Sequence, residues 1–297
     1  MGGYVIGMTP TDPTSGRKPR DDEIDVFGLT HPGKVRADNQ DHFFLGAIHR
    51  HLRILQTSLS DQDQLPFADE RLAFLAMVAD GVGSSEAGAE ASKITLANAT
   101  QYVLGSLNSF QNAGAESVEN ALQEAAMVSH EAVTARLKES PDLRSMATTL
   151  TLWLGMWPWY YLLQVGDSRC YLYRDGVLTQ LTRDQTMAQD LVDSGVLKRA
   201  QADRSRLANV LSSAIGGPTT APVVTRLRAD WKNVHLICSD GLTKHVPDEK
   251  IAERLRTMTS SKQVAEQLLQ DALDDGGTDN ITIIIGRVTP AASPPAL

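Results

Sequence analysis

Four aspartates lie where an apolar, strand-like run meets a turn, and each has a small residue beside it: Asp80, Asp167, Asp240 and Asp279. Asp80 ends the run LAFLAMVA, whose consecutive apolar residues predict a strand buried on both faces. The next residue, Gly81, lets the backbone turn sharply and leaves its carbonyl oxygen uncovered. Hard cations bind such carboxylate and carbonyl oxygens. One Asp-Gly pair is equally typical of a solvated turn, so the metal interpretation depends on the recurrence of the pattern.

Strand ends that share one edge of a sheet system can bring these four carboxylates together. Without a counter-charge they would repel one another, and at least one would stay protonated. Two divalent cations resolve the conflict, and oxygen donors without His or Cys favour Mg²⁺ or Mn²⁺ over zinc. Two such ions flanking a water generate a hydroxide near neutral pH, so the pattern predicts a hydrolytic dimetal site.

A polar loop at residues 31–41, HPGKVRADNQD, contains Arg36 and Asp41. The planar guanidinium of an arginine matches two phosphate oxygens, and an aspartate a few residues on could hold a metal-bound water. Charged loops between strands are commonly just solvated, so this loop supports the hydrolytic interpretation only together with the aspartates.

Composition sets the limits of function. The chain has 297 residues, 42% of them hydrophobic, and a net charge of -8, which argues against nucleic acid or an anionic membrane surface as the main partner. No apolar run approaches the ~20 residues of a membrane span. Cys170 and Cys238 lie in apolar runs and predict buried, reduced thiols, which fits a cytoplasmic protein. We expect one domain at residues 23–288, between a disordered leader at 1–22 and a disordered tail at 289–297.

Periodicity predicts the first half of that domain. Alternating polarity indicates strands at residues 24–30 and 42–48, which we expect to pair with each other. Apolar residues at helical spacing indicate two helices that cover the core, at residues 86–107 and 117–138, the second capped by Ser117.

In the second half, the period changes to two from residue 148, and an Asp175-Gly176 turn predicts an antiparallel meander. Residues 184–216 are charged and read as a helical insertion, either a flap beside the site or a plain surface helix pair. Two further helices are expected at residues 247–256 and 261–273.

Five short motifs occur in the order and approximate spacing of a known family. They are Arg36 with Asn39-Gln40-Asp41, Val78-Ala79-Asp80-Gly81, Gly166-Asp167-Ser168-Arg169, Ser239-Asp240-Gly241 and Gly277-Thr278-Asp279-Asn280. Over residues 23–288 the chain resembles the metal-dependent serine/threonine protein phosphatases of type 2C, particularly the compact bacterial branch. The resemblance implies an α+β fold, a four-layer αββα sandwich of two antiparallel sheets flanked by helices, with a small helical flap at about 184–216.

The resemblance also implies a metal ligand set. Asp80 would bridge two metals, the Gly81 carbonyl would bind one of them, and Asp240 with Asp279 would hold the other. Asp167 would help to hold a third, weaker metal. These ions would be Mn²⁺ or Mg²⁺, two per chain.

The catalytic residues implied by the resemblance are Arg36, which would grip the substrate phosphate, and Asp41, which would orient metal-bound waters. A hydroxide between the metals would attack phosphorus in line, without a phosphoenzyme. The implied partners are proteins phosphorylated on Ser or Thr, as substrates of a cognate kinase in signalling, and we expect a monomer.

Three residues depart from the family pattern. Gln40 stands where many members have glutamate, so metal contact there would be neutral or through water. Lys244 stands where an acidic residue often supports the third metal, and its positive charge predicts weak or absent third-metal binding. Val82 replaces a histidine proposed as general acid in animal members, although an apolar residue is common there in the bacterial branch.

Two other functions remain open from the sequence. One is a phosphatase-like binding or scaffold domain with little turnover, and the presence of Asp80, Asp240, Asp279 and Arg36 argues against it. The other is a dinuclear metallohydrolase acting on small phosphoesters.

Overall fold

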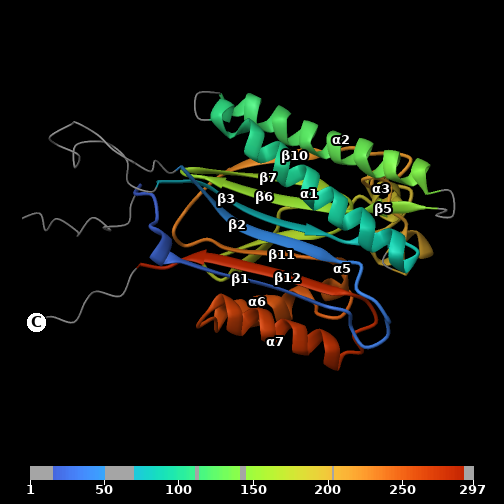
Figure 1. Cartoon of the computed structure of the whole chain (residues 1–297). Helices are drawn as coiled ribbons and strands as arrows, with labels where there is room; N and C mark the ends of the chain where they lie inside the picture. Colours follow the sequence, from blue (N-terminus) through green and yellow to red (C-terminus); the bar gives the residue numbers. More distant parts are fainter. Residues whose placement is uncertain (1–15, 51–69, 111–113, 141–144, 203, 291–297) are drawn as a thin grey trace, which may run out of the picture.

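Two antiparallel five-stranded sheets lie face to face, and helices cover both outer faces (Figure 1). The computed structural model describes residues 16–50, 70–110, 114–140, 145–202 and 204–290. The order of the layers is helix, sheet, sheet, helix, which confirms the predicted αββα sandwich.

The sheets combine strands from distant parts of the chain. The first sheet contains β1 (Ile24–His31), β8 (Arg169–Arg174), β9 (Val177–Gln180), β11 (Val234–Cys238) and β12 (Ile281–Val288). Its strand order is β1-β12-β11-β8-β9. The second sheet contains β2 (His42–Arg50), β3 (Glu70–Ala79), β6 (Leu150–Met156), β7 (Trp159–Val165) and β10 (Val223–Arg228). Its strand order is β10-β7-β6-β3-β2, and a small ribbon is formed by β4 (Gly81–Gly83) and β5 (Met146–Thr148).

The helices are divided between the two outer faces. On the second sheet lie α1 (Ser85–Phe110) and α2 (Ala115–Glu139), and on the first lie α5 (Asp240–Thr243), α6 (Asp248–Arg256) and α7 (Ser261–Asp274) (Figure 1). On α1, buried residues recur every fourth position, at Ala87, Ala91, Thr95, Ala99 and Val103. Residues at this spacing share one helix face, so α1 buries a single stripe, and its small side chains let the helix approach the sheet closely.

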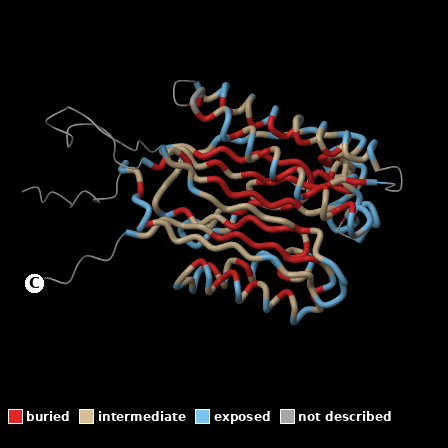
Figure 2. The backbone as a smooth tube through the Cα atoms, in the orientation of Figure 1, coloured by how far each residue is buried: buried red, intermediate tan, exposed pale blue. Residues whose placement is uncertain are grey.

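Strand β3 is apolar at consecutive positions because both of its faces are buried. Leu75 and Met77 pack under the helices, whereas Ala76 and Val78 pack between the sheets. Neighbouring side chains on a strand point to opposite faces, so a central strand between two apolar layers must be apolar at every position. In Figure 2, buried residues run along the middle strands of both sheets. Truncating a fully buried leucine such as Leu75 to alanine costs about 3 kcal/mol of stability.

The predicted pairing of the first two strands is wrong. β1 pairs with β12, with Ile24 opposite Val288, whereas β2 pairs with β3 in the other sheet. Both strands are amphipathic, and an alternating pattern identifies the buried face of a strand but not its partner. The loop at residues 32–41 is also longer than the two to five residues of a tight hairpin, and it crosses from one sheet to the other.

Two helical predictions need correction. α2 begins at Ala115 with Gly114 at its N-cap, so Ser117 lies inside the first turn instead of capping it. The insertion at residues 184–216 is mostly irregular, and its helical pieces are short: α3 (Met187–Asp193), α4 (Arg199–Ala202) and η3 (Arg206–Asn209). α3 ends at Ser194-Gly195, where Gly195 has a positive φ of 74°, and this left-handed conformation stops the helix.

The boundary of the predicted leader also needs correction. Residues 16–22 lie on the sandwich, where Arg71 of β3 forms an ion pair with Asp21, and Arg17 bonds Glu23 at 2.7 Å. Residues 1–15 and 291–297 lie outside the described residues. The two cysteines are free and buried in neighbouring strands β8 and β11, as predicted. Among the described residues, no helix is both long enough and apolar enough to cross a bilayer.

Candidate metal and phosphate site

The four aspartates singled out in the sequence lie at one edge of the sandwich. Asp80 follows β3 and Asp167 follows β7, both strands of the second sheet. Asp240 follows β11 and begins α5, and Asp279 precedes β12, both strands of the first sheet. The two facing sheets therefore each bring two of the aspartates to the end of the sandwich at which α5 begins.

Burial and mutual repulsion raise the pKa values of three carboxylates at this edge. Burial raises the pKa of Asp80 well above its usual value, and the negative charges of Asp41 and Asp240 raise it further. Burial, followed by the charge of Asp240, raises the pKa of Asp167 to about 8. The pKa of Asp41 rises to about 6, again mainly through burial. The carboxylates at this edge thus carry more negative charge than the nearby side chains neutralise. Bound cations would reduce the repulsion between them.

Two oxygens beside the aspartates lack partners. Asp41 is 2% exposed, and its Oδ2 accepts a hydrogen bond from Thr282 Oγ1 at 2.8 Å. Its Oδ1 and the Oε1 of Gln40 are buried and accept no hydrogen bond within the described structure. A buried acceptor without a partner costs about 1–3 kcal/mol, so both oxygens are suited to a ligand, water or cation.

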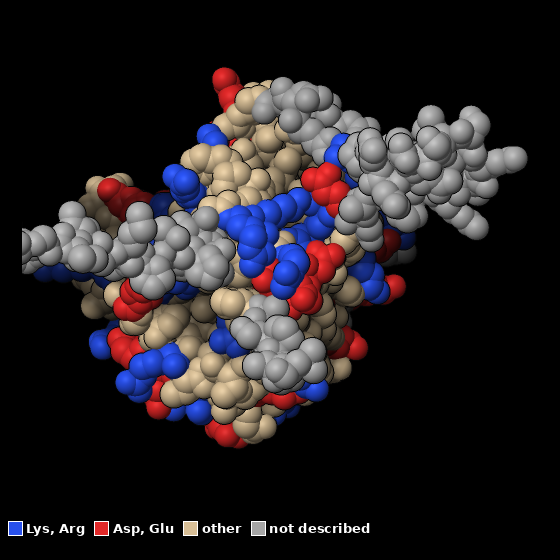
Figure 3. Space-filling model, turned by 90° about the vertical axis from the view of Figure 1, so that its left-hand side faces the viewer, with Lys and Arg blue, Asp and Glu red and all other residues tan. Residues whose placement is uncertain are grey.

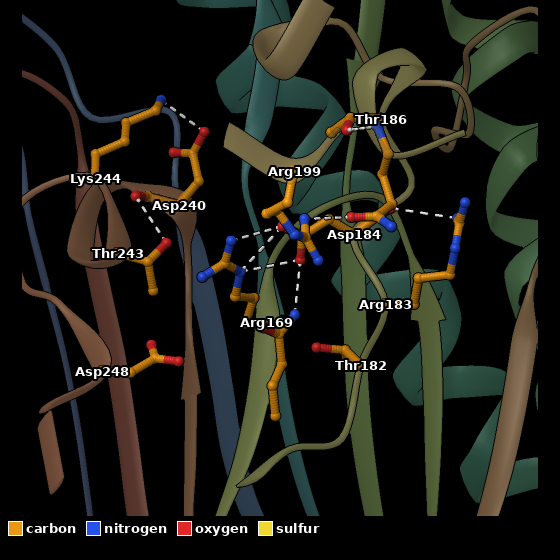
Figure 4. Close-up of polar contacts among 12 residues, drawn as sticks. Arg169, Thr182, Arg183, Asp184, Thr186, Arg199, Asp240, Thr243, Lys244 and Asp248 are labelled. Atoms are coloured by element: carbon orange, nitrogen blue, oxygen red, sulfur yellow. Dashed lines mark hydrogen bonds and ion pairs between the residues drawn. The ribbon is translucent and has the colours of Figure 1, made fainter. Parts of the chain in front are cut away.

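Lys244 supplies part of the missing positive charge. Its Nζ lies 2.6 Å from Oδ2 of Asp240 and 2.8 Å from Oδ2 of Asp279. Figure 4 shows the contact with Asp240, four residues earlier in the chain. The sequence identified Lys244 as a departure from the family pattern that opposes a third metal, and the structure places it between two of the carboxylates proposed to hold the second.

Arg36 also contacts a candidate ligand. Its Nε lies 2.9 Å from Oδ1 of Asp279, and its Nη2 donates to Oδ2 at 3.2 Å. Burial by itself would raise the pKa of Asp279, but hydrogen bonds from Lys244 and Arg36 bring that pKa below its usual value. The guanidinium is half exposed and already holds two oxygens of one planar group, which is the geometry by which arginine grips a phosphate.

The oxygen donors at this edge suit hard divalent cations, although the carboxylates are not arranged as a pre-formed coordination shell. Across residues 16–50, 70–110, 114–140, 145–202 and 204–290, no three His, Cys, Asp or Glu side chains converge as a metal-binding group. Asp240 and Asp279 are engaged by Lys244. The unpartnered Oδ1 of Asp41 and the raised pKa of Asp80 nevertheless indicate a place for positive charge, and oxygen donors suit Mg²⁺ or Mn²⁺.

Glycines allow the close approaches that build this edge. A Cβ on Gly81 would lie 2.3 Å from the carbonyl oxygen of Gly88 in α1, so β4 and the start of α1 could not meet at this distance. A Cβ on Gly241 would lie 1.9 Å from the carbonyl oxygen of Asn280. Both positions therefore need glycine, and both neighbour a candidate metal ligand.

Buried polar residues without an assigned role in the sequence connect the loops. Asn280 accepts from the Gln40 backbone N–H at 2.9 Å and donates to the carbonyls of Pro32 and Asp38, which fixes the loop that carries Arg36. On the other sheet, Thr149 Oγ1 accepts from the Asp80 N–H at 3.0 Å and lies 2.8 Å from the hydroxyl of Ser168. The only signal in the sequence was the position of Asn280 and Ser168 next to an aspartate, and Thr149 had no such signal.

The insertion begins at an ion pair beside Asp167. Arg169 bonds Asp184 through two nitrogens at 2.7–3.1 Å, as Figure 4 shows. The same arginine lines a polar cavity of about 470 Å³ together with Arg183 and Arg199, which come from the insertion and its base. Part of the residue 184–216 segment therefore borders a hollow that Arg169 also lines, two residues after Asp167, although little of that segment is helical.

The remaining predicted residues have simple structural roles. Val82 is 43% exposed on β4 and offers no titratable group. His130 of α2 accepts from the Gly216 N–H at 3.1 Å and contacts the Thr220 hydroxyl at 2.7 Å. His130 therefore has structural partners at the end of the insertion and just after it.

Comparison with known proteins identifies similar sequences. The family model described as "Protein phosphatase 2C" matches residues 53–276. The serine/threonine protein phosphatase PstP of Mycobacterium tuberculosis is 33% identical over 256 residues, which cover 86% of this chain and 43% of that protein. The serine/threonine phosphatase stp of Listeria monocytogenes is 30% identical over 215 residues, which cover 71% of this chain and 83% of that protein. The chain thus spans less than half the length of the PstP sequence.

Solved structures share the fold. A crystal structure of the Mycobacterium tuberculosis serine/threonine phosphatase PstP/Ppp superposes with a TM-score of 0.72 at 30% identity, covering 90% of this chain and 99% of that one. The PstP catalytic domain in complex with two manganese ions superposes with a TM-score of 0.70, also at 30% identity and with the same coverage.

Proposed function

This chain belongs to the protein phosphatase 2C family, and from that premise we propose that it hydrolyses phosphoserine and phosphothreonine esters in proteins with two bound Mn²⁺ or Mg²⁺ ions. The observation that supports this most strongly is the group of buried, mutually repelling carboxylates at one sandwich edge, with an unpartnered oxygen on Asp41. Two manganese ions in the related PstP catalytic domain support the same metal count.

We assign the metals to Asp80, the Gly81 carbonyl, Asp240 and Asp279, with Asp167 as a contributor to a weaker third position. When bound, two such ions act as Lewis acids and lower the pKa of water so that hydroxide is available near neutral pH. Lys244 already neutralises part of the charge of Asp240 and Asp279. Its positive charge supports the expectation that third-metal binding is weak or absent.

The substrate phosphate is assigned to Arg36. Its guanidinium is exposed at the site and presents two N–H groups to two oxygens of Asp279. These two bonds leave the Nη1 side of the guanidinium for two oxygens of a phosphate monoester, so Arg36 can bind the substrate while staying next to Asp279. The same charge stabilises the equatorial oxygens as negative charge builds up on them during phosphoryl transfer.

Water orientation is assigned to Asp41, and protonation of the leaving group is assigned to solvent. Oδ2 of Asp41 is fixed by Thr282, whereas Oδ1 is free to accept a hydrogen bond from a water and to orient it. Val82 has no proton to donate, so the departing serine or threonine oxygen takes its proton from water.

We further propose that the substrates are products of a serine/threonine kinase and that the protein works as a monomer in the cytoplasm. Two free, buried thiols, Cys170 and Cys238, support a reducing compartment. The two ion pairs of Lys244 favour a second candidate function, a scaffold domain with little turnover. The lysine already neutralises Asp240 and Asp279, which a metal ion would need as ligands.

Substrate preference separates the candidates. With Mn²⁺ present, kcat/KM is measured for a phosphothreonine peptide and for p-nitrophenyl phosphate, and we expect the peptide to be preferred. Preference for the small ester would favour a general phosphoesterase. No turnover of either substrate by a chain that binds Mn²⁺ would favour the scaffold.

A further inference from the structure

A nearly buried histidine, His245, lies between α5 and the turn that carries Asp279. It follows the end of α5 by two residues, and its side chain is only 7% exposed. Its Nδ1 lies 3.0 Å from a carboxylate oxygen of Asp275, at the C-terminus of α7. Its Nε2 accepts a hydrogen bond from the backbone N–H of Thr278 at 2.9 Å. The ring therefore joins the end of one helix to the turn that follows another.

The contacts of His245 define which ring nitrogen carries a hydrogen. A nitrogen that accepts from a backbone N–H has no hydrogen of its own, so Nε2 is unprotonated. The hydrogen is then on Nδ1, which donates to Asp275. The hydroxyl of Thr278 also lies 2.9 Å from Nε2. Asp275 thus orients the ring so that its accepting nitrogen faces Thr278.

The turn held by His245 starts at the C-terminus of α7 and ends at Asp279. Gly276 and Gly277 have positive φ values of 124° and 52°, which residues with side chains rarely adopt. Because two successive glycines have wide conformational freedom, contacts from outside the turn must fix its path. Thr278 directly precedes Asp279, so holding its N–H determines where the aspartate side chain begins.

A second contact with the same turn comes from the polar loop after β1. The Lys34 N–H donates to the Gly277 carbonyl at 2.7 Å. A Cβ on Gly33 would lie 2.2 Å from the carbonyl oxygen of Asp279, so the two backbones approach closely there. Those contacts are made by backbone, whereas that of His245 is made by a side chain. The contribution of His245 can therefore be removed by substitution.

We propose that His245 is a positioning residue for the second metal ion, because through Thr278 it holds Asp279 where that carboxylate can bind the ion. This role rests on the proposed function, in which Asp279 is a metal ligand. The direction of the effect separates it from a role through the neighbouring Lys244. A displaced Lys244 would repel the metal less and tighten its binding, whereas a displaced Asp279 would weaken metal binding.

The test measures Mn²⁺ binding to the full chain by titration calorimetry. His245→Ala is expected to weaken Mn²⁺ binding about tenfold, since residues that orient a metal ligand typically contribute this much. His245→Gln keeps an acceptor oxygen about as far from the backbone as Nε2, so we expect it to recover most of the affinity. His245→Asn has no acceptor that reaches Thr278, so it should bind as weakly as His245→Ala. If His245→Ala does not fold, His245→Gln is compared with His245→Asn.

A double-mutant cycle tests whether the effect passes through Asp279. In the Asp279→Asn background, the carboxylate that His245 positions is absent. We therefore expect His245→Ala to change Mn²⁺ affinity in that background by less than about twofold. Melting in EDTA shows that each variant is folded before the titration.

Two other histidines serve as matched controls. His130 also accepts from a backbone N–H, that of Gly216, and contacts a threonine hydroxyl, that of Thr220. His49 lies 3.6 Å from Asp21 in another His–Asp pair, roughly 25 Å along β2 from the metal site. Figure 3 views that end of the sandwich, where Lys and Arg gather near the centre with Asp and Glu beside them. His130→Ala and His49→Ala should leave Mn²⁺ affinity unchanged.

The outcomes separate this role from the proposed function. The role is overturned, and the phosphatase proposal stands, if the wild type binds Mn²⁺ and His245→Ala binds it equally or more tightly. It is also overturned if His245→Gln recovers no more affinity than His245→Asn, or if the loss persists in the Asp279→Asn background. A wild type that binds no Mn²⁺ would overturn the proposed function itself, and with it this role of His245.

Discussion

The ammonium of Lys244 lies 2.6 Å from a carboxylate oxygen of Asp240, so a residue proposed to bind metal is already neutralised by the chain itself. Burial opposes the charge on this lysine, but Asp240 and Asp279 raise its pKa above the usual value, and it stays protonated. A metal ion that binds here must therefore compete with the ammonium group of Lys244 for these carboxylates. This competition gives Lys244 a measurable effect on metal affinity.

Lys244→Met keeps the length of the side chain and removes its charge. We expect Mn²⁺ to bind about tenfold more tightly, because the repulsion between two cations is lost. The metal-free variant should be less stable by about 1 kcal/mol, because its carboxylates lose a counter-ion. Calorimetric Mn²⁺ titration and melting in EDTA measure both effects. Lys250→Met is the control, since Lys250 pairs with Glu253 on the surface of α6, and weaker Mn²⁺ binding in Lys244→Met would contradict the competition.

Asp80→Asn should abolish metal-dependent turnover and stabilise the metal-free fold. The pKa of Asp80 is raised well above its usual value by burial and neighbouring carboxylates, so an amide of the same shape relieves unfavourable charge. We expect a gain of about 1 kcal/mol in EDTA, measured by urea unfolding. Normal activity in this variant would show that the metal centre is misplaced.

Arg36→Ala should raise KM for a phosphothreonine peptide about tenfold with a smaller change in kcat, because a contact to the ground-state phosphate is lost. Arg36→Lys should recover part of the affinity, because it restores charge without the two-pronged geometry. Steady-state kinetics at saturating Mn²⁺ measures both. An unchanged KM in the alanine variant would remove Arg36 from the phosphate site.

Asn280→Ala should loosen the loop that carries Arg36. The asparagine side chain bonds Gln40, Pro32 and Asp38, and its loss leaves those backbone groups unpaired at a cost of about 2–3 kcal/mol. We expect a lower melting temperature together with a higher KM. A stable variant with wild-type KM would mean that the loop is fixed by other contacts.

Acid should destabilise the protein through His235. Burial between the sheets lowers the pKa of His235 to about 4, from 6.5 in the unfolded chain. The unfolded chain therefore binds more protons between these two values, so this contribution to stability is complete above pH 6.5 and is lost as pH falls toward 4. His235→Phe should flatten this part of the stability curve, followed by urea unfolding from pH 7 to pH 4. An unchanged slope would show that His235 is solvated.

Local patterns in the sequence were sufficient to predict much of the fold. The apolar run before Asp80 identified a central strand, because burial on both faces requires apolar residues throughout. The Asp175-Gly176 pair identified a hairpin, and the structure gives these residues positive φ values of 50° and 86°. In the structure the four strand-end aspartates come to one edge, because β3, β7 and β11 run toward that edge and β12 starts from it.

Relations between distant segments could not be predicted in this way. Whether β1 pairs with β2 or with β12 depends on loop paths and on which sheet offers a free edge, and neither is encoded in the alternation of β1. The contact between Lys244 and Asp240 had a local signal in their spacing of four residues, but the second contact, with Asp279, had none.

The most direct test of the proposed activity is phosphate release from a phosphothreonine peptide in excess EDTA and then in millimolar Mn²⁺, with Asp240→Asn measured in parallel. The proposed function requires no release in EDTA, release with Mn²⁺, and a loss of at least about a hundredfold in Asp240→Asn. Release that persists in EDTA, or that is unaffected in Asp240→Asn, would contradict a metal centre at this edge of the sandwich.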